Sequence, residues 1–471
     1  MNIDRAGNLA QLVAEFVCAD IRLPAQTLDR AKIIISDTLS ATIAGASSDV
    51  LAPLQRYLSG QTPANADKIV LGTSVRTTPE LAALANGTMA SALEFDDVMS
   101  LMPGHPSAVV LSALMASNAA LNATGGKLIE AYAVGTEAGV RIAQAITLDH
   151  YKRGFHATGT LALFSAVCAL GRINGLDENK LKQAVGIAAS MASGVQGNFG
   201  TMTKPLHSGW AARNAVAAVS LATAGLTACE QIFEAEGGFF ACYGSDASNA
   251  DKMPVLFGQP WVFDEPGLTL KLYPCCYASH RGMDALTQIM HRLDAGAADI
   301  REIRCQAPIG GLIPLKFAKP KTHFESLFSL PYSLAVTALD GMPGLRSFAQ
   351  SRVLSEDVAE MLSRIDVVES EDCVRDYPDY QVTSYGSRGE VRVQVETIDG
   401  RTDSQTIQIA PGHPKRPMTW SQAKSKWIGC MEAAGQSTQK AESIFPIIRE
   451  LETLGNFRSL IEQLSHESGT T

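Results

Sequence analysis

The chain has 471 residues, of which 46% are hydrophobic and 18% are charged, and its formal net charge is −9. This composition supplies enough apolar material for a large core, and the sequence lacks the basic run or stripe of a nucleic-acid-binding protein. An acidic protein that acts on an anion must gather positive charge locally. Clusters of lysine, arginine and histidine are therefore the first candidates for a binding site.

The cysteines and the N-terminal segment bear on the compartment. Nine cysteines are scattered without a CxxC pair, which favours free thiols over zinc, redox or iron–sulfur motifs. The opening stretch, MNIDRAGNLAQLVAEF, has early acidic residues and no continuous apolar region, so we expect no signal peptide. The longest apolar stretch, near residues 215–229, is interrupted by Ser220 and Thr223 and is too short to span a bilayer. These features predict a cytoplasmic protein without a membrane partner.

Helical patterns dominate residues 1–245, where apolar residues recur at helical spacing. Pro24 precedes the segment AQTLDRAKIIISDTLSATIAGA, which we expect to stop at Gly45. In TTPELAALANGTMASALEFDD, Thr78 is the predicted N-cap and Pro79 the first helical residue. Short connections between such segments predict antiparallel helix hairpins.

The pattern changes after about residue 265. REIRCQAPI resembles a strand, and EVRVQVETIDGRTDSQTIQIA alternates valines with polar residues. Asp399 and Gly400 predict a type I′ hairpin turn between two strands. Helical segments lie between these strands, and the pattern is helical again beyond about residue 418.

These patterns predict a mainly α protein with an α+β part. A large all-helical domain is expected from residues 1–265, completed by residues 418–471. A smaller α+β domain, residues 266–417, is expected as an insertion between the two helical parts.

The first polar cluster is ALEFDDVMSLMPGHPSA, which places Glu94, Asp96 and Asp97 at a predicted helix end, followed by His105. Carboxylates at a helix C-terminus oppose the helix dipole, so their charge requires compensation. Carboxylates with one histidine can bind magnesium or iron, but no second histidine lies at ligand spacing, and we expect no metal. A solvated acidic helix end is the alternative.

The second cluster is YKRGFHATGTLALF, in which His156 precedes a helix. The positive end of the helix dipole lowers the pKa of a histidine and favours its neutral, base-competent form. A histidine that merely caps the helix is the alternative.

The third cluster is GNFGTMTKPLHSGWAARN. Because the residue before a proline is biased away from α-helical backbone, we expect Lys204 in an extended loop and Ser208 as the N-cap of the next helix. With His207 and Arg213 nearby, the loop predicts an anion site that combines backbone amides and cations. A basic surface loop is the alternative.

The fourth cluster is LKLYPCCYASHRGMDAL, in which His280 and Arg281 open a predicted helix and could bind an anion there. A solvated helix end is the alternative. Cys275 and Cys276 lack the surroundings of a catalytic cysteine, so we assign them to packing.

No known cofactor motif accompanies these clusters. The sequence contains no GxGxxG after a strand, Walker loop, GxSxG elbow or HExxH. Carboxylates, histidines and a lysine around an anion pocket suit proton abstraction next to a carboxylate, with cations that hold the developing enolate-like charge.

The order of LEFDD and GHPS, HATGT, GTMTKPLHSGWAARN and YPCCYASHRGMDA resembles the MmgE/PrpD family over nearly the whole chain. That family contains 2-methylcitrate dehydratase, cis-aconitate decarboxylase and iminodisuccinate epimerase. The resemblance implies a helical domain built from both chain ends, a smaller inserted α+β domain, and usually a homodimer. It also implies a cleft between the domains as the active site, with no metal or organic cofactor.

Carried over by motif position, the catalytic candidates are Asp96, His105, His156 and Lys204. Together with the cationic helix starts, the same motifs give as substrate-binding candidates Glu94, Asp97, His207, Arg213, His280 and Arg281. The chain departs from the family at Glu94, where members often have aspartate, and at Val98, where they often have threonine or serine. Citrate-type substrates are therefore less securely implied.

We expect a cofactor-independent lyase, a dehydratase or decarboxylase, that acts on a small di- or tricarboxylic acid by proton abstraction α to a carboxylate. An epimerase of an iminodisuccinate-type dicarboxylate is the close alternative, because reprotonation on the opposite face follows from the same first step. A non-catalytic binding protein on the same scaffold is the second alternative.

Overall fold

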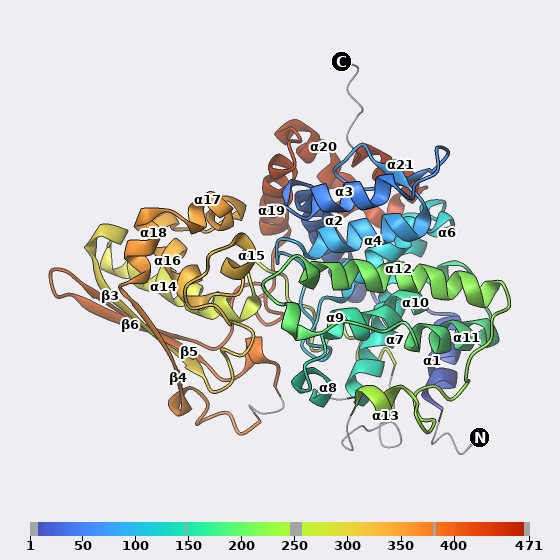
Figure 1. The fold of residues 1–471 in the computed structure, drawn as a ribbon, viewed down its shortest axis with the longest axis horizontal. Helices are drawn as coiled ribbons and strands as arrows, with labels where there is room; N and C mark the ends of the chain where they lie inside the picture. Colours follow the sequence, from blue (N-terminus) through green and yellow to red (C-terminus); the bar gives the residue numbers. More distant parts are fainter. Residues whose placement is uncertain (1–7, 147, 245–256, 380–382, 466–471) are drawn as a thin grey trace.

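The computed structural model describes residues 8–146, 148–244, 257–379 and 383–465, which form two lobes side by side (Figure 1). The helical lobe consists of packed helices and one short hairpin, and the sheet lobe holds a four-stranded sheet with helices against it. A mainly α fold with an α+β part, as predicted, is confirmed.

Helices from the first half of the chain build most of the helical lobe. They are α1 (Leu9–Cys18), α2 (Ala25–Ala44), α3 (Leu51–Ser59), α4 (Pro79–Ser91), α5 (Pro106–Ala116), α6 (Asn118–Leu121), α7 (Gly125–Ile146), α8 (Asp149–Lys152), α9 (Ala157–Thr160), α10 (Ala162–Ile173), α11 (Glu178–Ala189), α12 (Thr203–Thr223) and α13 (Phe239–Tyr243). The hairpin pairs β1 (Lys68–Ile69) with β2 (Arg76–Thr77). The predicted starts after Pro24 and Thr78, and the predicted stop at Gly45, are confirmed.

The C-terminal segment returns to this lobe as α19 (Trp420–Ala433), α20 (Thr438–Arg449) and α21 (Phe457–Gln463). Both α19 and α20 pack on α2 (Figure 1). Trp427 of α19 is fully buried and donates its indole N–H to the carbonyl of Ala441 at 2.9 Å. The two chain ends thus share one core, while the predicted domain limits at residues 265 and 418 stay a prediction.

The sheet lobe contains α14 (His280–Leu293), α15 (His323–Ser326), α16 (Leu330–Asp340), α17 (Gln350–Val353) and α18 (Glu356–Leu362). Its strands are β3 (Ile300–Pro308), β4 (Ile365–Ser370), β5 (Val391–Thr397) and β6 (Thr402–Ile407), in the order β4-β3-β5-β6. The pair β3 and β4 is parallel, and the other pairs are antiparallel. Helices α14 and α16 pack on the sheet.

Both predicted strand regions are confirmed, and the alternating valines of β5 are buried. The predicted type I′ turn is wrong. That turn requires positive φ at two central residues, whereas Gly400 has a φ of 87° and Asp399 does not share this conformation. Sequence patterns also missed β4, whose residues are only partly buried and lack a clear apolar period.

Close packing of α4 against α12 positions the candidate site. A Cβ atom on Gly87 would lie 2.8 Å from the Cα of Gly209, so neither position tolerates a side chain without a shift of the helices. This contact brings the C-terminal end of α4, which leads to the acidic cluster, beside the first turns of α12, which carry Lys204 and His207.

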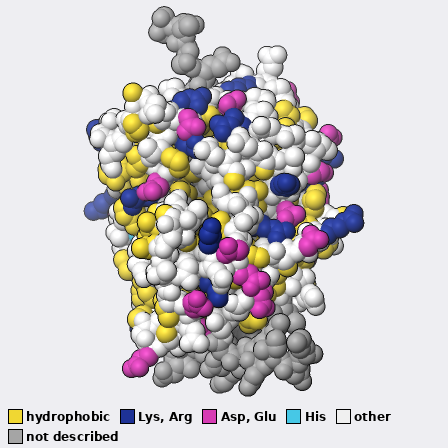
Figure 2. Space-filling view, turned by 90° about the vertical axis from the view of Figure 1, so that its right-hand side faces the viewer, with side chains coloured by type: hydrophobic (Ala, Val, Ile, Leu, Met, Phe, Trp, Pro, Cys, Tyr) yellow, Lys and Arg dark blue, Asp and Glu magenta, His cyan; other side chains and the backbone are white. Residues whose placement is uncertain are grey.

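The surface of the helical lobe shown in Figure 2 mixes lysine and arginine with acidic side chains, without a continuous basic stripe on that face. Among the described helices, none combines the length and apolar character needed to cross a membrane.

Candidate active site

The acidic cluster lies in a short segment between α4 and α5. Glu94 has a φ of 49°, in the left-handed region that non-glycine residues seldom adopt. Beyond it, Val98 pairs with Thr269 through two backbone hydrogen bonds of 2.8 and 2.9 Å. This pairing draws the segment that carries Lys271 alongside the acidic cluster.

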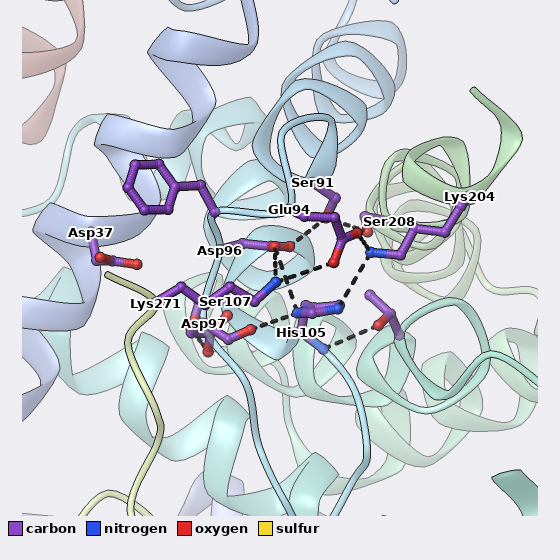
Figure 3. Close-up of polar contacts among 12 residues, drawn as sticks. Asp37, Ser91, Glu94, Asp96, Asp97, His105, Ser107, Lys204, Ser208 and Lys271 are labelled. Carbon is purple, nitrogen blue, oxygen red and sulfur yellow. Dashed lines mark hydrogen bonds and ion pairs between the residues drawn. The ribbon is translucent and has the colours of Figure 1, made fainter. Parts of the chain in front are cut away.

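Two lysines neutralise the carboxylates (Figure 3). Lys204 donates from its Nζ to Glu94 Oε1. Lys271 donates to Glu94 Oε2 at 3.1 Å and lies 3.6 Å from Asp96 Oδ1. All four side chains are buried. Burial would raise the pKa of Glu94, but Lys204 and Lys271 hold it well below its usual value.

Asp97 has a different environment from its neighbour. Its Oδ2 accepts a 2.6 Å hydrogen bond from Ser107, whose hydroxyl also contacts the Tyr132 hydroxyl at 2.6 Å. Burial raises the pKa of Asp97 to about 8, and the nearby Asp96 and Asp37 carboxylates add to the shift. Asp97 is therefore protonated near neutral pH, whereas the pKa of Asp96 is lowered by His105 and the two lysines against the effect of burial.

His105 is held in one tautomer. Its Nδ1 lies 2.6 Å from the carbonyl oxygen of Asp97 and 3.6 Å from Asp96 Oδ1. Both neighbours are acceptors, so Nδ1 carries the proton and Nε2 presents a lone pair, 3.4 Å from Lys204 Nζ. Burial lowers the pKa of His105 to about 4, although Asp96 opposes the shift. The imidazole is thus a neutral base beside an ammonium donor.

His156 precedes α9, as predicted, but its side chain does not cap that helix. Its Nδ1 lies 3.0 Å from Nδ1 of His207, and its ring meets the Phe199 ring edge to face. Burial holds the pKa of His156 well below its usual value, and Lys204 adds to the effect. Burial also lowers the pKa of His207 to about 4.

The predicted loop around Lys204 is wrong in its backbone. Helix α12 begins at Thr203, so Lys204 and His207 lie in its first two turns rather than in an extended loop. Proline is tolerated in the first turn of a helix, which lets Pro205 follow Lys204 there. Ser208 is not an N-cap, and its hydroxyl contacts the Ser91 hydroxyl of α4 at 2.7 Å.

The pocket contains some of the predicted residues and not others. Glu94, His105, His156 and Lys204 line it, together with Lys271, in a pocket that is partly open to solvent. Residues of the sheet lobe close it from the other side, including Tyr277, Pro314 and Tyr385. Asp96, Asp97 and His207 lie behind the lining, each in contact with a lining histidine.

Three predicted anion ligands lie elsewhere. Arg213 stacks on Trp210 at 4.7 Å and lies 3.8 Å from Glu80. Arg281 is buried and donates to the carbonyls of Arg388 and Gly389 at 2.7 and 2.8 Å. The described pocket lining does not include Arg213, Arg281 or His280, whose Nε2 lies 3.4 Å from the Cys275 carbonyl.

One group of potential metal ligands occurs in the described part of the chain. Single ligand atoms of Glu94, Asp96 and His105 lie within 4.8 Å of one another. However, Lys204 and Lys271 already direct their ammonium groups at this set. A divalent cation would have to replace that positive charge, so the arrangement does not suit a metal.

Sequence reasoning missed Lys271 and Lys426. Lys271 is a single cation within LTLKLY, and a charge in such an apolar stretch was the available signal. Lys426, on α19, donates to the carbonyls of Phe95 and Lys271 at 2.7 and 2.9 Å and lies 2.7 Å from Asp37 Oδ1 on α2. Its ammonium also sits 3.7 Å from the centre of the Phe95 ring. Lys426 therefore fixes the backbone beside Glu94, Asp96 and Lys271.

Comparisons with known proteins agree with this architecture. The family model of the MmgE/PrpD N-terminal domain matches residues 7–251, and that of the MmgE/PrpD C-terminal domain matches residues 273–450. A cis-aconitate decarboxylase of Homo sapiens is 27% identical over 440 residues, which cover 91% of this chain and 88% of the human protein. A cis-aconitate decarboxylase of Aspergillus terreus is 26% identical over 470 residues, covering 94% of this chain and 92% of the fungal protein.

Proposed function

Since the chain belongs to the MmgE/PrpD family, we propose that it is a carboxylic acid lyase whose active site is the pocket around His105. The observation that carries the proposal is the His105 imidazole, which is neutral, fixed with its Nε2 lone pair outward, and adjacent to Lys204. The cis-aconitate decarboxylases that match most of the chain support decarboxylation as the first reaction to test.

The proposed chemistry needs only side chains. Loss of carbon dioxide leaves the electron pair of the broken C–C bond on the neighbouring carbon, conjugated with a second carboxylate or a double bond. Lys204 and Lys271 stabilise this enolate-like charge, and a proton delivered through His105 or Lys204 completes the product. Dehydration uses the same groups in another order, with proton removal by His105 followed by loss of hydroxide. We accordingly propose a cofactor-independent reaction.

Epimerisation is the second candidate, because a second neutral imidazole lines the pocket. The ring centres of His105 and His156 are 6.3 Å apart, and both histidines have lowered pKa values. An epimerase needs one group to remove a proton and another to return a proton to the opposite face. This pair could serve that purpose for an iminodisuccinate-type dicarboxylate.

Proton NMR in deuterium oxide tests these reactions. The chelator-treated protein is incubated with citrate, 2-methylcitrate, cis-aconitate and iminodisuccinate-type acids. A new vinyl signal or released carbon dioxide supports a lyase, whereas deuterium exchange or inversion without elimination supports an epimerase. No reaction with any of these acids would contradict this range of substrates and favour other carboxylates or a binding protein.

A matched pair of variants ties any activity to this pocket. His105→Asn removes the proposed base, whereas His291→Asn changes an exposed histidine on α14. We expect the first to lower kcat/KM by about 10²–10⁴-fold and the second to leave it unchanged. Equal activity of the two variants would place the chemistry elsewhere.

We further propose that the protein is a homodimer, on the family resemblance alone, and that it is cytoplasmic, because its nine cysteines are scattered without a CxxC pair. Size-exclusion chromatography with light scattering tests the dimer, and imaging of a tagged chain tests the location.

A further inference from the structure

His207 lies behind the pocket and contacts His156, which lines it. The two Nδ1 atoms are 3.0 Å apart, and the ring centres are 5.2 Å apart. Such a contact is a hydrogen bond when one Nδ1 carries a proton and the other offers a lone pair. Burial lowers the pKa of both histidines, to about 4 at His207, so both rings are neutral near pH 7. The pair therefore shares one proton between the two Nδ1 atoms.

Two glycines pack closely against this pair. Gly194 accepts a 3.0 Å hydrogen bond from the backbone N–H of His156, and a Cβ atom on Gly194 would lie 3.2 Å from Cγ of His207. Gly194 has a φ of 130°, in a region that favours glycine. A Cβ atom on Gly159 would likewise lie 3.2 Å from the Cβ of His207. The backbone thus leaves the His207 ring little freedom to turn away from His156.

The two Nε2 atoms of the pair face different surroundings. Because Nδ1 of His156 is turned to His207, its Nε2, on the other side of the ring, is the nitrogen available to the pocket. The His207 side of the pair is 8% exposed. In the described part of the chain, Nε2 of His207 has no protein partner and is not among the polar atoms enclosed without one. Substrate can therefore meet one end of the pair while solvent meets the other.

The proposed decarboxylation consumes one proton in each turnover. Carbon dioxide leaves without a proton, and the electron pair that stays on carbon takes one up to form the new C–H bond. Nδ1 of His105 meets the Asp97 carbonyl, which passes no proton on, so Nε2 of His105 is an acceptor in the free protein. His156 differs because its second nitrogen contacts another titratable ring. Among the described lining histidines, it is thus the one with a path for a proton away from the pocket.

We propose that His156 and His207 form a proton relay that supplies the pocket from solvent while bound substrate excludes water. The inference rests on the proposed lyase function. Before the reaction, Nδ1–H of His207 donates to Nδ1 of His156, and Nε2 of His156 holds the proton to be delivered. As that proton bonds to the substrate carbon, the shared proton moves to Nδ1 of His156, and Nε2 of His207 takes a proton from solvent. Both rings end neutral, in the opposite tautomers.

The relay returns to its first state after the product has left. Water in the open pocket gives a proton to Nε2 of His156, the shared proton moves back to Nδ1 of His207, and Nε2 of His207 releases a proton to solvent. Over both stages one proton passes from water to the product, which balances the decarboxylation. His207 touches no substrate and is a positioning residue that acts through His156. Dehydration and epimerisation return as many protons as they take, so they do not require this relay.

NMR spectra of protein labelled with ¹⁵N-histidine test the shared proton without any turnover. At pH 7 we expect a ¹⁵N–¹⁵N coupling across the hydrogen bond between Nδ1 of His156 and Nδ1 of His207. The coupling should be absent in His207→Ala. Two rings that both carry their proton on Nε2, without a coupling, would overturn the proposal because the relay needs the shared proton.

Kinetics with added imidazole test the passage of the proton. With cis-aconitate as substrate, His207→Ala should lower kcat by about 10²-fold, the lower end of what a positioned proton donor contributes, and leave KM unchanged. Imidazole that enters the vacated site from solvent should restore kcat by at least about tenfold. A wild-type kcat in His207→Ala, or a loss that imidazole does not restore, would overturn the proposal.

Two further variants separate the relay from a structural role. His207→Asn keeps a hydrogen-bonding amide near the Nδ1 position but passes no proton on, so it should lose as much kcat as His207→Ala while unfolding in urea like wild type. His323→Ala is the matched control, because His323 is also 8% exposed and its Nδ1 lies 2.6 Å from the Phe348 carbonyl, outside the described pocket lining. It should keep kcat and show no response to imidazole. Full activity of His207→Asn would overturn the relay.

The outcomes also distinguish this inference from the proposed function. The coupling without turnover of any carboxylic acid would support the relay and contradict the lyase. Decarboxylation with a wild-type kcat in His207→Ala would support the lyase and contradict the relay.

Discussion

Lys426 offers a sharp test of how the C-terminal helix supports the site. Lys426→Met keeps a long apolar stem but removes the ammonium that contacts Asp37 and the carbonyls of Phe95 and Lys271. Removing one partner of a buried ion pair typically costs about 3–5 kcal/mol. Burial already raises the pKa of Asp37, so this carboxyl can take up a proton and keep the cost near the lower end of that range.

The same substitution should affect catalysis through geometry. The two carbonyls released by Lys426→Met lie in the backbone beside Glu94, Asp96 and Lys271, so these side chains lose an anchor. A misplacement of about 1 Å can lower a rate by about 100-fold, and we expect kcat/KM to fall by about 10- to 100-fold. Lys426 is thus a positioning residue, since it does not line the described pocket.

Urea unfolding and steady-state kinetics measure both effects. Lys424→Met is the matched control, because Lys424 lies on the same helix, its side chain is 45% exposed, and it pairs with Glu442 at 3.2 Å. An exposed pair contributes about 0–1 kcal/mol, so this variant should remain close to wild type. The double variant Asp37→Asn with Lys426→Met should regain part of the stability, because no lone carboxylate stays buried. If Lys426→Met unfolds within about 1 kcal/mol of Lys424→Met, the reasoning from buried charge is refuted.

Further tests concern protonation, packing and metal. Asp97 has a pKa of about 8 in the folded protein, against an ordinary value of 3.8, so between these pH values the folded state binds a proton that the unfolded state has lost, and stability falls as pH rises. Asp97→Asn should remove up to about 1.4 kcal/mol per pH unit of this dependence in urea titrations, and an unchanged slope would contradict the assignment. Because His105 has a pKa of about 4 in the free protein, kcat/KM should decline as pH falls through that value, and a limb near 6.5 would contradict a buried neutral imidazole. Gly209→Ala should destabilise the protein by about 1–3 kcal/mol in thermal unfolding, since its Cβ would lie 2.1 Å from the Leu84 carbonyl oxygen. Exhaustive chelation should leave turnover intact, and loss of turnover with recovery on metal addition would refute the cofactor-independent reaction.

The sequence predicted much of the fold because local signals and tertiary packing agree there. Pro24, Gly45 and Thr78 mark helix limits that the structure confirms. Around Lys204 the local signals and the tertiary packing disagree. Pro205 indicated extended backbone at Lys204, but helix α12 already begins at Thr203. Lys204 is buried there against Glu94, which belongs to another segment. A proline in the first turn is compatible with either conformation, so tertiary contacts decide the outcome.

In the candidate site too, residues within short motifs could be predicted from the sequence, whereas residues whose partners lie far away in the sequence could not. His105 and His156 could be singled out because short motifs surround them, and the structure brings both into one pocket. Lys271 and Lys426 lie in no such motif. Their carboxylate partners are far away in the sequence: Glu94 is 177 residues from Lys271, and Asp37 is 389 residues from Lys426. Each lysine is stable in the interior only because a distant carboxylate meets it.

The buried charges of Glu94, Lys204 and Lys271 limit which substitutions the site can accept. Glu94 is held in left-handed backbone, and its two oxygens contact lysines from two other segments. Replacing either lysine alone leaves Glu94 with less compensation, and replacing Glu94 alone leaves Lys204 without the carboxylate that contacts it and Lys271 with Asp96 only. Stability therefore constrains all three residues together. We expect a single substitution at any of them to lower stability, and a paired substitution that keeps the charge balance to lower it less.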